Sequence, residues 1–117
     1  MNLSGFHLTP IGGGGFLLEP TRGLDISMRD ELIESILSRL QSAKSSRLYY
    51  DLSELAVIDT VYYGWLDALA RACATMNVKM VCIHMQPTAA FALTHFLQGL
   101  PAFETALDVE ARSVTVS

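Results

Sequence analysis

Hydrophobic and polar positions along the chain first follow the pattern of a hairpin. Two short apolar segments, 5–11 and 16–19, flank the glycine run at 12–15. Glycines between two β-like segments are typical of a hairpin connection. A phosphate-binding loop would require a Lys-Ser/Thr pair and a helix directly after the glycines, and neither follows here.

The next segment has the spacing of an amphipathic helix. Five apolar residues recur on one side at intervals of one helical turn. They are Leu32, Ile33, Ile36, Leu37 and Leu40. Ser27 followed by Asp30 resembles a capping box at the start of this helix, and Asp25 is a second candidate cap.

Strands and helices are then predicted in alternation. The order is a strand at 48–52, a helix at 60–76, a strand at 78–85, a helix from 87 to about 98, a strand near 103–107 and a helix from 108. Pro87 suits a first helical position and Gly99 suits a helix end. The strand at 78–85 is nearly continuous in apolar residues, which is typical of a central strand covered on both faces.

The helix at 60–76 has an expected core face of about 140°. Its members are Val61, Trp65, Ala68, Leu69, Ala72, Cys73 and Met76. Together these elements predict an α/β fold with a mixed, mostly parallel sheet, an N-terminal β-hairpin and about four packing helices. We expect residues 1–117 to form a single domain.

Composition narrows the classes of function. Charged residues make up 17% of the chain, against roughly 25% in ordinary domains. The net charge is −4 and only eight residues are Lys or Arg, so we expect no nucleic-acid binding. No signal peptide or membrane-spanning stretch is visible, so we expect a cytoplasmic protein without membrane contact.

Three motifs, in order, resemble the STAS domain, which is found in sulfate transporter tails and anti-sigma-factor antagonists. The first is the segment 48–53 with Asp-Leu, followed by Val-Ile-Asp-Thr at 57–60 and a helix. The second is Met-Gln-Pro-Thr-Ala-Ala at 85–90, and the third is the segment 104–110. The last two are similar to the stressosome scaffold subclass, of RsbS and RsbR type.

The resemblance implies that Thr60 is a phosphorylation site. The length of the chain is similar to that of the RsbS type, because the RsbR type carries an additional N-terminal sensor domain. The short scaffold proteins usually carry Ser at the position of Thr60 and the longer sensor type carries Thr, so the RsbS-like and RsbR-like roles stay open. From the residues alone, Asp59 and Thr60 are also ordinary caps of a helix, and a cap hydroxyl is compatible with phosphorylation.

Two helix faces are candidate contact surfaces because they hold little charge for solvated surfaces. The predicted outer face of the second helix carries Tyr63, Gly64, Asp67, Ala70, Arg71 and Ala74. The third helix carries Phe91 and His95 outside its apolar arc. With Asp59, we expect Tyr63, Gly64, Asp67, Arg71, Phe91 and His95 to bind partners.

The sequence gives little support to an enzymatic function. Cys82 and His84 lie two residues apart on a predicted strand, where their side chains would share a face. A small thiol-dependent enzyme that uses Cys82 is therefore one hypothesis, but a buried cysteine is usually structural. The three histidines have no metal-ligand spacing, and we expect no catalysis, cofactor or metal.

The resemblance implies a non-enzymatic, phosphorylatable scaffold and antagonist of a bacterial stressosome. Such a protein would bind and sequester a serine/threonine switch kinase and co-assemble with longer STAS-containing sensor proteins. The alternative is a stand-alone anti-sigma-factor antagonist that binds an anti-sigma kinase. A subunit that hides several faces in a homo- or hetero-oligomer would also explain the low charge content.

Overall fold

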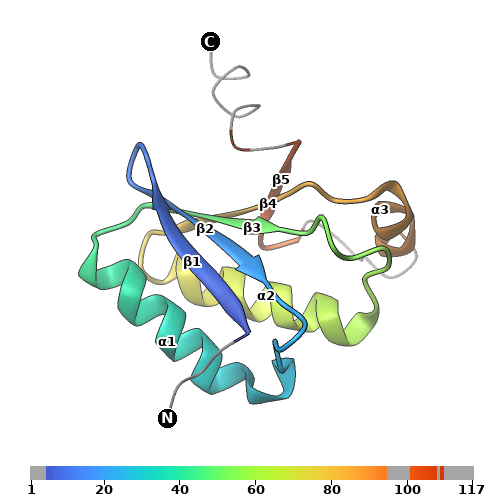
Figure 1. Ribbon diagram of the computed structural model, residues 1–117, viewed down its shortest axis with the longest axis horizontal. Helices are drawn as coiled ribbons and strands as arrows, with labels where there is room; N and C mark the ends of the chain where they lie inside the picture. The colour runs from blue at the N-terminus through green and yellow to red at the C-terminus, as the bar shows by residue number, and fades with distance from the viewer. Residues whose placement is uncertain (1–4, 95–100, 108, 110–117) are drawn as a thin grey trace.

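A computed structural model describes residues 5–94, 101–107 and 109 (Figure 1). The elements over these residues are β1 (Phe6–Ile11), β2 (Gly15–Pro20), the 3-10 helix η1 (Ile26–Met28), α1 (Arg29–Ser42), β3 (Arg47–Asp51), α2 (Thr60–Ala74), β4 (Lys79–Ile83), α3 (Pro87–Leu93) and β5 (Glu104–Ala106). The predicted alternation of strands and helices is confirmed. The expected end of the third helix near 98 falls outside the described residues, and so does the expected helix from 108 except for Val109. The described residues hold three α-helices.

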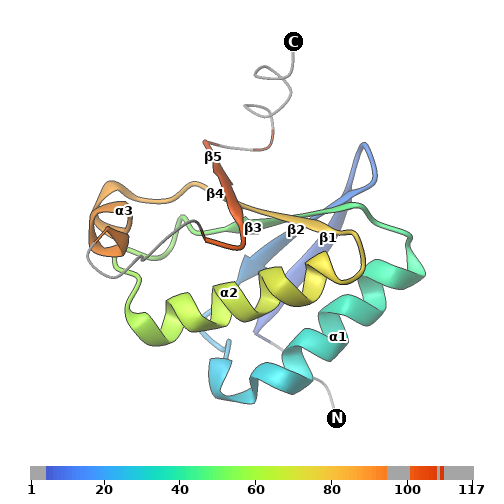
Figure 2. The same cartoon turned by 180° about the vertical axis from the view of Figure 1, so that it is seen from behind.

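The five strands form one sheet in the order β1-β2-β3-β4-β5. β1 and β2 are antiparallel, with Phe6 opposite Pro20, while the other neighbouring strands run parallel. The predicted mixed sheet with an N-terminal hairpin is therefore confirmed. α1 and α2 lie side by side on one face of the sheet, and α3 lies beyond one end of the strands (Figures 1 and 2).

The glycine run turns the chain between β1 and β2. Gly13 and Gly14 have φ angles of 79° and 80°, which side chains other than glycine rarely adopt. A Cβ atom on Gly15 would lie 3.3 Å from the ring of Tyr49. The backbone N–H of Ser46 donates to the carbonyl of Gly14 over 2.9 Å, so the turn is tied to the segment between α1 and β3.

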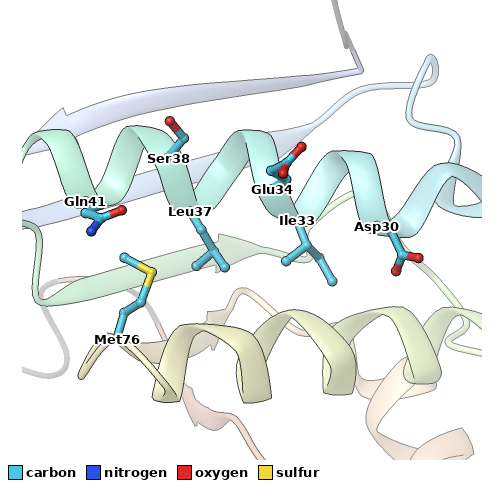
Figure 3. Close-up of a pocket in the computed structure, with 7 residues that line it drawn as sticks. All are labelled: Asp30, Ile33, Glu34, Leu37, Ser38, Gln41 and Met76. Carbon is cyan, nitrogen blue, oxygen red and sulfur yellow. The ribbon is translucent and has the colours of Figure 1, made fainter.

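α1 divides its apolar residues between the sheet and α2. Leu32, Ile36 and Leu40 are buried against the main core, while Ile33 and Leu37 are half-buried. Figure 3 shows Ile33 and Leu37 pointing toward α2, and these residues line a shallow groove between the two helices. The apolar residues at helical spacing therefore belong to two contact surfaces of α1, one against the sheet and one toward α2.

The start of α1 differs from the predicted capping box. Asp25 Oδ1 accepts hydrogen bonds from the backbone N–H of Ser27 over 3.0 Å and from its hydroxyl over 2.6 Å. These bonds cap η1, and Met28 holds the N-cap position of α1 without a side-chain hydrogen bond. Since α1 has no side-chain cap bond, the prediction of a Ser27–Asp30 box is wrong, and Asp25 caps η1 directly before α1.

The buried face of α2 is rotated from the predicted one. Leu66 and Ala70 are buried with Trp65, whereas Val61 is 68% exposed. Val61 belongs to the first turn of α2, and Figure 2 shows this turn projecting beyond the ends of the strands. The prediction that Val61 belongs to the core and Ala70 to the outer face is therefore wrong.

The other face of the sheet has a smaller core. Tyr49, Val81 and Ile83 are buried there, and Ile11, Leu17, Ala106 and Val109 pack against them. Met80 and Cys82 of β4 belong instead to the main core. β4 is thus covered on both faces, as its unbroken run of apolar residues predicts.

Candidate phosphorylation and partner-binding site

The carboxyl ends of β3 and β4 carry a hydrogen-bonded cluster that leads toward α2. Asp51 Oδ1 accepts from the backbone N–H of Ser53 over 2.8 Å and lies 3.1 Å from His84 Nδ1. Gln86 Nε2 donates to the Ser53 carbonyl over 2.7 Å. The Thr88 hydroxyl donates to the carbonyl of Ala56, further along the same loop. The segment from β3 to α2 is thereby fastened to the start of α3.

The electrostatics of this cluster depend on Asp51. Its partial burial acts to raise the pKa of the carboxyl, but hydrogen bonds from Ser53 and His84 outweigh that effect and lower the pKa below its ordinary value. Asp51 is therefore negatively charged in the folded protein at neutral pH, and it holds the loop in place through that charge.

α2 begins at the predicted pair of residues. Asp59 is the N-cap, and its Oδ1 accepts from the backbone N–H of Tyr62 over 2.8 Å. Thr60 follows as the first helical residue, and its side chain is exposed. The structure thus assigns the cap to Asp59 and leaves the Thr60 hydroxyl on the surface at the helix start.

A buried network fixes the first turn of α2 to the sheet. The hydroxyls of Tyr50 and Tyr62 lie 2.6 Å apart, and Trp65 Nε1 donates to the Tyr50 hydroxyl over 2.9 Å. Burial raises the pKa of both tyrosines, so the phenols stay neutral. This network was not predicted from the sequence. The sequence feature that could have indicated the network is a pair of tyrosines, one on a buried strand and one just after a helix cap.

Several predicted partner residues share one outward stripe of α2. At 100° per residue, Thr60, Gly64, Asp67 and Arg71 fall within about 60° of one another. Arg71 Nε donates to Asp67 Oδ2 over 2.8 Å, with side-chain exposures of 72% and 25%. This is the i,i+4 pair that the spacing indicates, and such an exposed pair contributes only a few tenths of a kcal/mol.

Tyr63 and the predicted partner residues of the third helix do not belong to this outward stripe. The Tyr63 ring packs edge-on against Phe103 at a centroid distance of 6.0 Å, which leaves Tyr63 only partly exposed. Phe91 on α3 is 68% exposed. His95, the other predicted partner residue of this helix, lies outside the described residues.

Exposed apolar side chains flank the helix start and form a surface that was not predicted from the sequence. Val57, in the loop before Asp59, is 60% exposed, and Val61, directly after Thr60, is 68% exposed. In the sequence, Val57 stands between a strand and a helix cap, and that position could have indicated its exposure. Val61 follows helical spacing and was therefore assigned to the core.

The two thiols lie in the interior. Cys73 and Cys82 are free and buried. Burial raises the pKa of Cys73 to about 12 and raises that of Cys82 still further. β4 ends at Ile83, and His84 leaves the strand at a φ of 60° to meet Asp51. The expectation that Cys82 and His84 share a strand face is therefore wrong, and the geometry does not support a thiol nucleophile.

Within the described part of the chain, none of the helices has the length and apolar character needed to cross a bilayer.

Comparisons with known proteins give a fold but no sequence family. No protein-family model and no curated protein matches the sequence. A serine-to-glutamate variant of RsbS from Moorella thermoacetica has 19% identity and a TM-score of 0.73, over 97% of this chain and 100% of that one. A chain from the molecular architecture of the stressosome, a signal integration and transduction hub, has 17% identity and a TM-score of 0.72, over 94% and 95%.

A more distant likeness extends the same fold. The anti-sigma factor antagonist SpoIIAA, in its unphosphorylated form, has 13% identity and a TM-score of 0.59, over 95% of this chain and 96% of that one. The chain therefore has the STAS fold of RsbS and SpoIIAA, as the three sequence motifs imply.

Proposed function

We propose that this protein is a non-enzymatic scaffold and antagonist in a bacterial stress-signalling complex of the stressosome type. It binds and sequesters a serine/threonine switch kinase in the cytoplasm, and phosphorylation of Thr60 changes that binding. The proposal is supported by fold likenesses to RsbS and to a stressosome chain. The structure of SpoIIAA, which shares the fold, is described as that of its unphosphorylated form.

The exposed hydroxyl of Thr60 is the observation that carries the proposal. A kinase must bring the γ-phosphorus of ATP to the acceptor oxygen, and Thr60 presents that oxygen at the start of a firmly anchored helix. In the transfer, Thr60 Oγ1 forms a bond to phosphorus, the hydroxyl proton is lost and ADP leaves. The chain itself supplies only the acceptor, which agrees with a non-enzymatic role.

The added phosphate changes the charge of the docking surface. It contributes about −1.5 to −2 charges at neutral pH, next to Asp59. A kinase seated over Val57 and Val61 would then meet a dianion among apolar contacts, and desolvating that charge is costly. Phosphorylation therefore releases the kinase in this proposal.

Partner assembly also accounts for the low charge of the surface. The exposed apolar residues Val57, Val61 and Phe91 are placed around the helix start and on α3. Longer STAS-containing sensor proteins and further copies of this chain are the partners that would cover such surfaces.

Phosphate transfer tests the assignment of Thr60. The cognate switch kinase is incubated with labelled ATP and with the wild type, Thr60→Ala or Thr75→Ala. Thr75 is an exposed threonine at the far end of the same helix, so it is the matched control. We expect label in the wild type and Thr75→Ala only. Equal labelling of Thr60→Ala, with its fold verified by circular dichroism, would overturn the assignment.

The likeness to SpoIIAA favours a second candidate, a stand-alone antagonist that binds an anti-sigma kinase. Size-exclusion chromatography with the products of neighbouring genes separates the two. A megadalton particle is the expected result for the scaffold, whereas a small complex of this chain with one kinase would favour the antagonist.

A further inference from the structure

The first residue of α1 places a guanidinium beside the first turns of α2. A Cβ atom built on Gly64 would lie 4.0 Å from Arg29 Nη1, and no other atom would approach as closely apart from the adjacent residues and the nearby helix backbone. Gly64 has no side chain to displace this group. Arg29 therefore lies against the outward stripe of α2 that also carries Thr60.

Thr60 lies one helical turn before Gly64 on the same stripe. Residues four apart on a helix have Cβ atoms about 5–6 Å from each other. A phosphate on Thr60 Oγ1 would extend further from the helix, and the long arginine side chain rotates freely at an exposed position. Because Arg29 is exposed, a change of its rotamers can carry the guanidinium toward that phosphate.

Arg29 has no carboxylate partner among the described residues. The ion pairs there involve Arg71, Lys79 and His84. A cation in the first turn of a helix also opposes the helix dipole, so Arg29 does not stabilise α1 by its charge. Its guanidinium, with five donors in a planar fork, suits the oxygens of a phosphate.

We infer that the guanidinium of Arg29 binds the phosphate on Thr60. This inference rests on the proposed function only in naming Thr60 as the modified residue. The phosphorylated chain forms a charge-assisted contact between the starts of α1 and α2. Two carboxylates act against it, Asp59 beside Thr60 and Asp30 in the groove between the helices. The contact covers the Gly64 segment of the stripe, so phosphorylation reshapes this surface as well as charging it.

Phosphorus NMR of a chain with phosphothreonine incorporated at position 60 tests this inference without any kinase. The second pKa of a phosphothreonine is about 6. We expect that pKa to be lower in the wild-type background than in Arg29→Ala by about 0.5–1, because an adjacent cation favours the dianion. Arg29→Lys should restore part of the shift, since it keeps the charge but loses the fork.

Arg71→Ala is the matched control. Arg71 shares the stripe but lies about 16 Å from Thr60 along the helix, where salt screens its charge. We expect this variant to titrate like the wild type. Identical phosphate pKa values in the Arg29→Ala and wild-type backgrounds would overturn the role of Arg29. Failure of kinase labelling at Thr60 would overturn the proposed function and leave this result unchanged.

Discussion

The hydroxyl of Tyr50 lies 2.6 Å from the hydroxyl of Tyr62, which joins a central strand to the first turn of the helix that carries Thr60. The direction of the bonds follows from Trp65. An indole N–H only donates, so the Tyr50 oxygen accepts from Trp65. The Tyr50 proton then requires the Tyr62 oxygen, because Tyr50 has no exposed surface. The Tyr62 proton is left to point outward.

Replacing Tyr50 should therefore cost more than replacing Tyr62. Tyr50→Phe leaves the buried Trp65 N–H without its acceptor, which costs about 1–3 kcal/mol. Tyr50→Phe breaks both bonds of the network, whereas Tyr62→Phe keeps the bond from Trp65 and breaks only the bond between the two hydroxyls. Urea unfolding of both variants at neutral pH measures the difference. A larger loss in Tyr62→Phe would contradict the central place of Tyr50 in the network, and the double variant gives the coupling between the two sites.

The charge of Asp51 should support the fold at neutral pH and fail in acid. The pKa of this carboxyl is lower in the folded chain than in the unfolded one. Its contribution is therefore present above the unfolded pKa and is lost as the pH falls through the folded pKa. We expect Asp51→Asn to destabilise the chain by about 1 kcal/mol near pH 6, with a gap that closes in acid.

Chemical unfolding over a range of acidic pH checks this expectation for Asp51. Glu54→Gln is the control, because Glu54 is an exposed carboxylate in the same loop, and its effect should stay within about 0.5 kcal/mol. If the gap between Asp51→Asn and the wild type were constant with pH, the charge of Asp51 would have no part in stability.

The buried thiols predict a loss of stability in alkali. Burial raises the pKa of Cys73 from 9.0 to about 12. Because the folded value is the higher one, the stabilising contribution is complete below pH 9.0 and is lost as the pH rises toward 12. The slope is at most about 1.4 kcal/mol per pH unit for each thiol.

Variants separate the Cys73 thiol from the other groups that titrate in alkali. Cys73→Ala removes one of the two thiols, so its free energy of unfolding should fall less steeply with pH than that of the wild type. Its lower stability at neutral pH, caused by the smaller side chain, does not affect the slope. Equal slopes in urea unfolding would show that Cys73 ionises alike in both states.

The order of elements could be predicted from the sequence because each element has a local signal. Glycines mark the hairpin turn, and Asp59 with Thr60 stands between a strand and a helical repeat. The face of α2 could not be predicted in this way. Apolar residues occur on most sides of this helix, so spacing alone does not separate exposed Val61 from buried Leu66.

Contacts between distant segments also left no local signal. His84 continues an apolar run, and only its partner Asp51, thirty-three positions earlier, shows why the strand ends before it. The position of Arg29 beside Gly64 depends on how α1 crosses α2. Thr60 is thus a candidate site that its neighbours in sequence indicate, whereas the residues that surround it came from the fold.

Gly64→Ala should stabilise the isolated chain. Glycine inside a helix is less favourable than alanine by about 1 kcal/mol, and the added methyl would meet only Arg29 Nη1, at the ordinary contact distance of 4.0 Å. Thermal unfolding measures the gain, and Ala68→Gly on the same helix should give a loss of similar size. If Gly64 admits a close partner, the stabilised variant should assemble less well. A destabilised Gly64→Ala would show that the space over Gly64 is filled.

Val61 should matter for association and not for folding. Its side chain is 68% exposed, so Val61→Ser should change the free energy of unfolding by no more than about 0.5 kcal/mol. Leu66→Ala, on the buried face, should cost about 2–5 kcal/mol. Size-exclusion chromatography with the partner proteins should show weaker assembly for Val61→Ser, because an apolar contact beside Thr60 is lost. If Val61→Ser assembled like the wild type, the surface around the helix start would not be the docking site, and the low charge of the chain would require a different interface.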